Sequence, residues 1–132
     1  MTTTPRFLTV TDVMAIHRRV IEEFGGDSGL RDRGLLEAAV AMPRAMFGGA
    51  FLHAGLAAMA AAYHFHLCGN HPFVDGNKRV ALATAELFLL VNGHTLLATD
   101  DEVEHLTMGV AAGAIGKDRV TGFFAEHVAP AQ

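Results

Sequence analysis

Two segments of the chain are apolar around nearly the whole circumference of the helix that each predicts, and this constrains the fold more than any other feature. The first runs from about Ala54 to Leu67, and the second from about Gly76 to Val91. A helix that is apolar on every side is typical of the centre of a bundle. The most apolar stretches, Ala54–Ala62 and Val80–Val91, are too short to span a bilayer. The sequence therefore predicts an all-α protein with two central helices and no membrane association.

Four further helices complete the predicted fold. Periodicity and capping residues place them at about 10–24, 33–42, 100–114 and 119–128. The expected N-cap residues of these helices are Thr9, Asp32, Thr99 and Asp118. No linker separates the segments, and 132 residues with 51% hydrophobic side chains suit one core. We therefore expect a single domain over residues 1–132, a bundle of about six helices.

The charge and cysteine content restrict the partners and the compartment. Basic side chains number 10 and acidic ones 14, so the formal net charge is −4 and no basic face for nucleic acid is indicated. A single cysteine, Cys68, excludes an internal disulfide and is typical of a reducing cytoplasm. The N-terminal stretch MTTTPRFLTVTD lacks the apolar core of a secretory signal. We expect a cytoplasmic protein that does not bind nucleic acid directly.

One short segment, AMFGGAFL at residues 45–52, does not have a helical pattern. Two apolar runs flank Gly48 and Gly49, and paired glycines accept the positive φ angles that a two-residue hairpin turn requires. We expect a β-hairpin that packs on the bundle or pairs with another strand, because an isolated hairpin is only marginally stable. A surface loop with a few buried anchor residues is the alternative.

The stretch HPFVDGNKR, residues 71–79, separates the two central helices and bears the most specific chemistry. Pro72 disfavours helical geometry at His71, which we expect to be extended, with its imidazole facing a ligand. Unpaired N–H groups at the start of the next helix would bind an anion, most often phosphate. Lys78 and Arg79 lie in this first turn, where the helix dipole disfavours cations. Their placement therefore indicates a polyphosphate site.

The remaining polar residues of the stretch have defined roles in such a site. Asp75 would hold the magnesium ion that bridges the phosphates, since Mg²⁺ prefers carboxylate and phosphate oxygens. His71 would accept the proton of an attacking hydroxyl. Asn77 would offer an amide to orient the phosphate or the metal. Gly76 has no Cβ and would let the backbone approach the phosphate closely.

Other interpretations of these residues stay open. Taken alone, Asp75 is explained as an N-cap, Lys78 as a solvent-exposed side chain, and Arg79 as the partner of a distant acid. A histidine-metal hydrolase would combine His71 with a histidine of the preceding helix. His64 and His66 are two residues apart and so point in different directions, which is unlike the four-residue spacing of zinc ligands.

The stretch HPFVDGNKR resembles the signature of the Fic/Doc family, H-P-F-x-[D/E]-G-N-[G/K]-R. GLRDRGLLEAAVAMP, FGG and NHPFVDGNKRVALATAELFLLVNGH follow in the order of its death-on-curing (Doc) branch, the toxins of type II toxin–antitoxin systems, from about Leu8 to Phe124. The resemblance implies a compact Fic-like helical fold, ATP and Mg²⁺ as cofactors, and transfer to a protein hydroxyl. By position it assigns catalysis to His71 and Asp75, the metal to Asp75, and the phosphates to Gly76, Asn77 and Arg79.

The resemblance also assigns a function to the predicted hairpin. The family has a flap there, which aligns a target segment beside the active site by strand pairing. The residues expected to do so are Met46, Phe47, Gly48, Gly49, Ala50 and Phe51. In the Doc branch the resemblance implies a kinase that phosphorylates translation elongation factor Tu and halts protein synthesis.

Two positions bear on which group is transferred. Most adenylyl-transferring Fic enzymes have a second glycine at the position of Lys78, whereas the Doc branch has lysine. Gly76 departs from Doc, so the phosphate cradle is partly Fic-like. We predict phosphate transfer, with Lys78 among the nucleotide-binding residues. Adenylyl transfer is the alternative, and a degenerate Fic fold that only binds a partner is disfavoured by the intact motif.

Regulation is predicted from an absent motif. Many Fic proteins silence themselves with an inhibitory helix, [S/T]-x-x-x-E-[G/N]. The single serine, Ser28, is followed four residues later by Asp32, and no threonine has a glutamate at that spacing. We therefore expect inhibition in trans by a small antitoxin, bound in a groove bordered by the hairpin.

Overall fold

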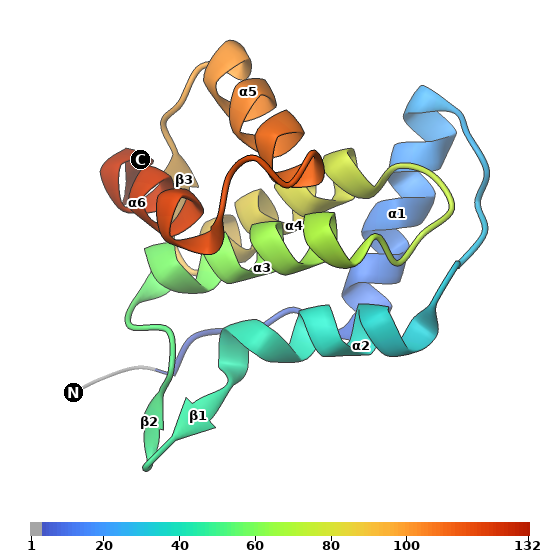
Figure 1. Cartoon of the computed structure of the whole chain (residues 1–132). Coiled ribbons are helices and arrows are strands. Elements are labelled where there is room, and N and C mark those ends of the chain that lie inside the picture. The colour runs from blue at the N-terminus through green and yellow to red at the C-terminus, as the bar shows by residue number, and fades with distance from the viewer. Residues whose placement is uncertain (1–3) are drawn as a thin grey trace.

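The two apolar segments form the centre of the molecule. The computed structural model describes residues 4–132, in which these segments are helices α3 (Leu56–Asn70) and α4 (Asn77–Val91). They pack against each other and are joined at one end by the loop of residues 71–76 (Figure 1). Helix α3 begins and ends slightly later than expected, so it reaches the motif directly. The prediction of an all-α fold is confirmed.

Helices α1 (Val10–Phe24) and α2 (Arg33–Ala41) cover this pair, α1 against α4 and α2 against α3 (Figure 1). Their predicted N-caps are confirmed, because the side chains of Thr9 and Asp32 accept hydrogen bonds from the first turns. The α-helical part of the second helix ends one residue earlier than expected. A turn of 3-10 helix, η1 (Met42–Arg44), then carries the chain through its proline.

The predicted hairpin is also confirmed. Strands β1 (Met46–Phe47) and β2 (Ala50–Phe51) pair antiparallel, and the turn between them is formed by Gly48 and Gly49. Their φ angles are 59° and 82°, which non-glycine residues adopt only with strain.

The C-terminal helices, α5 (Asp100–Ala111) and α6 (Lys117–His127), both contact α3. The predicted capping box of Thr99 is present. The prediction that Asp118 caps the last helix is wrong: Gly116 occupies the N-cap, and Asp118 lies in the first turn. Within residues 4–132, no helix combines the length and apolar content needed to cross a membrane.

A second small sheet was not expected. Strand β3 (His94–Leu96) follows α4 and pairs antiparallel with β4 (Val128–Pro130), which follows α6. Each strand has three residues, which is too short for a periodic pattern, and the pairing joins distant parts of the chain.

The central helix α3 holds a polar side chain inside the core. His64 is fully buried, and its Nε2 lies 2.8 Å from the hydroxyl of Thr107 on α5. That hydroxyl donates its own proton to the carbonyl of Val103, so Nε2 of the imidazole is the donor to it. The other ring nitrogen, Nδ1, has no hydrogen-bond partner within residues 4–132. Burial lowers the pKa of His64 to about 4, because a proton on Nδ1 would bury an uncompensated charge.

This burial predicts that the protein loses stability in mild acid. Between pH 6.5 and about 4, the unfolded chain binds a proton at His64 and the folded chain does not. The free energy of unfolding therefore decreases as the pH is lowered through this range. From pH 7 to pH 5 the loss due to His64 is about 2 kcal/mol. Urea denaturation of the wild type and of His64→Leu at both pH values measures it. Equal losses in the two proteins would contradict the prediction.

Candidate active site

His71 lies at the junction of α3 and the motif loop. Its φ and ψ angles are 52° and 53°, in the left-handed region, and its side chain is exposed. The expectation of extended geometry is wrong. Because α3 continues to Asn70, His71 ends the helix, and a left-handed residue is a common way to do so. This conformation also avoids the right-handed helical region that a following proline disfavours.

The loop is held from within by Asn77. Its side chain is buried, and its Oδ1 accepts a hydrogen bond from the N–H of Phe73 at 2.9 Å. Its Nδ2 donates to the carbonyl of the same residue at 2.8 Å. Phe73 is itself buried in the core, as the plug that fixes the loop. The amide of Asn77 therefore braces the loop and does not face a phosphate, which leaves its main-chain N–H for that role.

His17 is a second brace, which the sequence interpretation missed. Its ring stacks on Phe73 at 3.8 Å between centroids, and its Nε2 donates to the carbonyl oxygen of Asp75 at 3.0 Å. His17 is buried, although histidine is a polar residue type. Its spacing from Val13 and Val20, four and three residues, is the signal that would have found it.

Asp75 does not cap the helix that follows. One of its carboxylate oxygens, Oδ2, accepts a hydrogen bond from the N–H of Asp27 at 2.8 Å, and its side chain is exposed. The N-cap of α4 is Gly76, which has φ 84° and provides no side-chain hydrogen bond. A Cβ on Gly76 would face Val20 and Ile21 of α1, so glycine serves the backbone angle there and not the approach of a ligand.

The first turn of α4 presents positive charge without an internal partner. Its N–H groups have no side-chain cap, and it contains no acidic residue. Lys78 and Arg79 are exposed, and neither forms an ion pair in residues 4–132. The guanidinium of Arg79 lies 4.1 Å from the ring centre of Phe24, at the end of α1. Because no described carboxylate lies within ion-pair distance of these two cations, the turn is suited to binding an anionic ligand.

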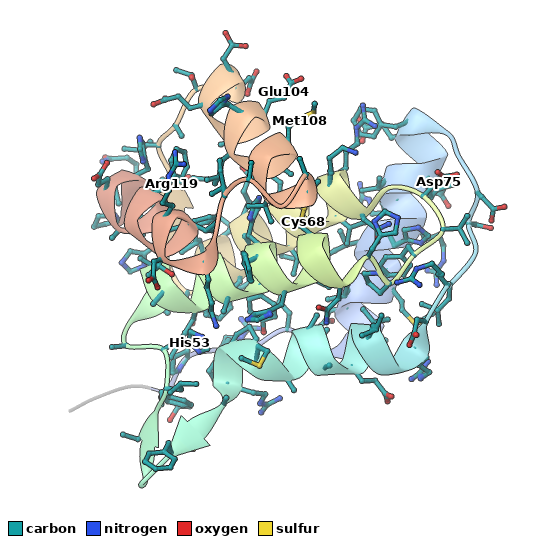
Figure 2. The ribbon with its side chains drawn as sticks, in the orientation of Figure 1. His53, Cys68, Asp75, Glu104, Met108 and Arg119 are labelled. Atoms are coloured by element: carbon teal, nitrogen blue, oxygen red, sulfur yellow. The ribbon has the colours of Figure 1, made fainter. Side chains whose placement is uncertain are left out.

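A cleft of about 1080 Å³ extends from this turn between α1, α4 and α5. Residues 75–79 line one end of it, and His71 lies outside its lining. Glu104 and Met108 line it from α5, across from α1 and from the loop that bears Asp75 (Figure 2). Glu86 of α4 also lines the cleft, and burial and the nearby Asp100 carboxylate raise the pKa of its carboxyl group. The cleft thus has a cationic end at the motif, an apolar middle and an acidic side.

The hairpin does not lie beside this site, contrary to the expectation for Met46, Phe47, Gly48, Gly49, Ala50 and Phe51. None of these residues lines the cleft. The hairpin precedes α3 and the motif follows it, and this helix of 15 residues is roughly 22 Å long. Figure 1 shows the hairpin and the motif loop at opposite ends of α3.

The side chains favour magnesium with a phosphate over zinc. In the part of the chain that the structure describes, no three His, Cys, Asp or Glu side chains gather into a metal-binding group. His64 is held inside the core, so the zinc interpretation has no support. Asp75 has an exposed carboxylate with one oxygen, Oδ1, that accepts no hydrogen bond within residues 4–132. A single carboxylate oxygen beside bound phosphates suits Mg²⁺, which usually takes its other ligands from phosphate and water.

Comparison with known proteins identifies the family of the chain. Residues 7–89 match the sequence model of the Fic/DOC family. The chain is 42% identical to "Toxin Doc" of Mycolicibacterium smegmatis over 111 residues. These aligned residues are 83% of this chain and 85% of that protein. The chain is 32% identical over 115 residues to "Protein kinase doc" of Escherichia phage P1, covering 87% and 90% respectively. The resemblance drawn from HPFVDGNKR is confirmed.

Proposed function

Because the chain belongs to the Fic/Doc family, and within it to the Doc branch, we propose that it is a toxin that transfers the γ-phosphate of ATP to a protein hydroxyl. The observation that supports this most is the start of α4, which has no side-chain cap and contains two cations, Lys78 and Arg79, that form no ion pair within residues 4–132. Such a start favours anions, and adjacent phosphates match both charges. The relatives named as a toxin and as a protein kinase support the same function.

In the proposed reaction, a bond forms between the acceptor oxygen and the γ-phosphorus while the bond to the β–γ bridging oxygen breaks and ADP leaves. His71, on the loop beside the phosphate site, accepts the proton of the acceptor hydroxyl. The free oxygen of Asp75 would help to hold Mg²⁺, which would supply positive charge to neutralise the phosphates. Lys78, Arg79 and the N–H groups of the first turn stabilise the charge that develops on the transferred phosphate.

We propose translation elongation factor Tu as the target and the cytoplasm as the place of action, both from the likeness to the Doc branch. The hairpin is the proposed contact for the target. Its Phe47 is 83% exposed and Met46 is also exposed, so the hairpin offers apolar side chains to a partner. Because the hairpin lies at the far end of α3, it would contact a surface of the target that is distant from the hydroxyl to be phosphorylated.

Lys78 favours phosphate transfer over adenylyl transfer. A glycine at its position would leave room for a phosphate against the helix start, whereas lysine adds a flexible stem and a point charge. Adenylyl transfer needs the α-phosphate against the helix start beside His71, where this stem would crowd it. A charge there can instead stabilise the γ-phosphate of a nucleotide bound in the reverse direction.

We therefore expect the wild type to add a phosphate to its target. Lys78→Gly should lose this activity and gain weak adenylyl transfer, while Lys78→Ala, which removes the charge without freeing the backbone, should only lose activity. Mass spectrometry of elongation factor Tu treated with each variant and ATP distinguishes the products. An adenylyl group on the wild-type product would overturn the kinase proposal and favour the adenylyltransferase.

We propose that an antitoxin segment binds in the cleft between α1, α4 and α5, and not at the border of the hairpin. The cleft has an apolar wall, which includes Leu82, Leu87 and Met108, and it opens onto the phosphate site. A helical segment with an apolar face fits such a groove. Its binding would block the cationic end that the nucleotide needs.

Calorimetry with the antitoxin peptide tests this placement. We expect favourable enthalpy opposed by ordering entropy, which is typical of a disordered segment that folds as it binds. Met108 is 55% exposed, so Met108→Glu should leave the fold intact and weaken binding about tenfold or more. Phe47→Glu on the hairpin is the matched control and should bind like the wild type. The reverse pattern would place the antitoxin at the hairpin.

A further inference from the structure

Arg31, on the segment between α1 and α2, contacts three consecutive carbonyl groups at the end of α3. Its Nε donates to the carbonyl of His71 at 2.7 Å, and its Nη2 donates to the carbonyl of Asn70 at 2.9 Å. Its main-chain N–H donates to the carbonyl of Pro72 at 2.8 Å, as does the N–H of Asp32 at 3.0 Å. The carbonyls before, at and after His71 therefore all accept hydrogen bonds from Arg31.

The conformation that Arg31 holds is a costly one. His71 is the only non-glycine residue of the described chain with a positive φ. A left-handed backbone is strained in a residue that has a Cβ, because the Cβ crowds the following carbonyl oxygen. The last carbonyls of a helix lack partners and have a negative partial charge, and a guanidinium that donates to two of them offsets this cost. Because φ and ψ set the direction of the Cα–Cβ bond, the same contacts set where the imidazole points.

The side chain of Arg31 has no other structural duty. It is exposed, and within residues 4–132 it forms no ion pair.

The main-chain hydrogen bonds between the Arg31 segment and the motif loop do not depend on the Arg31 side chain. The N–H of Val74 donates to the carbonyl of Gly29 at 2.9 Å, and Leu30 forms a β-bridge with Phe73. Nδ2 of Asn70 also donates to the carbonyl of Leu35. Removing the guanidinium should thus free His71 without detaching the loop.

We propose that Arg31 is a positioning residue that holds His71 in the left-handed conformation from which its imidazole reaches the acceptor hydroxyl. This inference rests on the proposed phosphate transfer. Arg31 lies on the α2 side of the loop and does not line the cleft that contains Lys78 and Arg79. It should therefore affect the rate of transfer and leave the affinity for ATP unchanged.

The test compares Arg31→Gln and Arg31→Lys with the control Arg33→Gln. Arg33 is a nearby exposed arginine whose contact with Glu37 joins two side chains that are both more than half exposed. We expect Arg31→Gln to lower kcat about tenfold to a hundredfold. ATP affinity by calorimetry and the melting temperature should stay close to those of the wild type. Arg31→Lys keeps the charge and should recover part of the rate, and Arg33→Gln should match the wild type.

A second readout does not depend on activity. In ¹H–¹⁵N spectra, the main-chain amide and ring nitrogens of His71 should shift in Arg31→Gln and stay in place in Arg33→Gln. Unchanged His71 resonances, or a loss of ATP affinity equal to the loss of rate, would overturn the positioning role. If His71 shifts in Arg31→Gln but His71→Ala transfers phosphate at the wild-type rate, the proposed function fails and the structural role of Arg31 stands.

Discussion

We expect the protein to arrest growth when it is produced alone in bacteria, and replacing His71 by alanine should abolish this arrest. The side chain is exposed on the loop that leads into the cationic turn of α4, so its loss should remove the base and leave the fold intact. A positioned general base contributes about 10²–10⁴ to the rate. Growth curves after induction, together with phosphate transfer by the purified proteins, measure the effect.

The matched control is His105→Ala, which removes another exposed histidine, on α5, that does not line the cleft. It should arrest growth like the wild type. Circular dichroism and immunoblotting establish that the variants are folded and equally abundant. Undiminished toxicity of His71→Ala under these conditions would remove His71 from the catalytic role.

Asn77→Ala should destabilise the protein and inactivate it together. Both polar groups of this side chain bond to the backbone of Phe73, and both residues are buried. Alanine would leave a buried N–H and a buried carbonyl without partners, which lowers the free energy of unfolding by about 3 kcal/mol. Once the loop is released, His71 and Asp75 lose their positions relative to α4. Chemical denaturation and transfer assays would record both losses.

Lys78→Ala separates this structural role from binding. Lys78 is adjacent in sequence but exposed, so its variant should keep the stability of the wild type and still lose activity. A stable Asn77→Ala protein that fails to bind ATP would show that the amide contacts the nucleotide directly, and the bracing role would be wrong.

The sequence predicted those features whose causes act within a few residues. Thr9 and Thr99 cap their helices through groups three residues away, and the hairpin turn follows from Gly48 and Gly49 alone. The placement of Lys78 and Arg79 in the first turn of α4, which the helix dipole disfavours, was also readable from the motif. All of these predictions depend on local chemistry, so no knowledge of the packing was needed.

The features that escaped prediction join distant parts of the chain. His17 bonds to Asp75 across 58 residues, and Arg31 bonds to His71 across 40. The left-handed angle of His71 depends on where α3 ends, which the sequence placed three residues too early. Asn77 was expected to face a ligand because its type suits one, but its direction is set by the buried backbone of Phe73. Residue types indicated the chemistry, and tertiary contacts decided the orientation.

The length of α3 has an evolutionary consequence. The hairpin and the cationic turn of α4 lie on separate parts of the surface, and no hairpin residue lines the cleft. If the cleft holds the phosphates and the antitoxin as proposed, substitutions at Met46 or Phe47 would leave both unaltered, and substitutions in the cleft would leave the surface of the hairpin unaltered. Under these proposed roles, recognition of the target and escape from inhibition would evolve as two separate traits within one small protein.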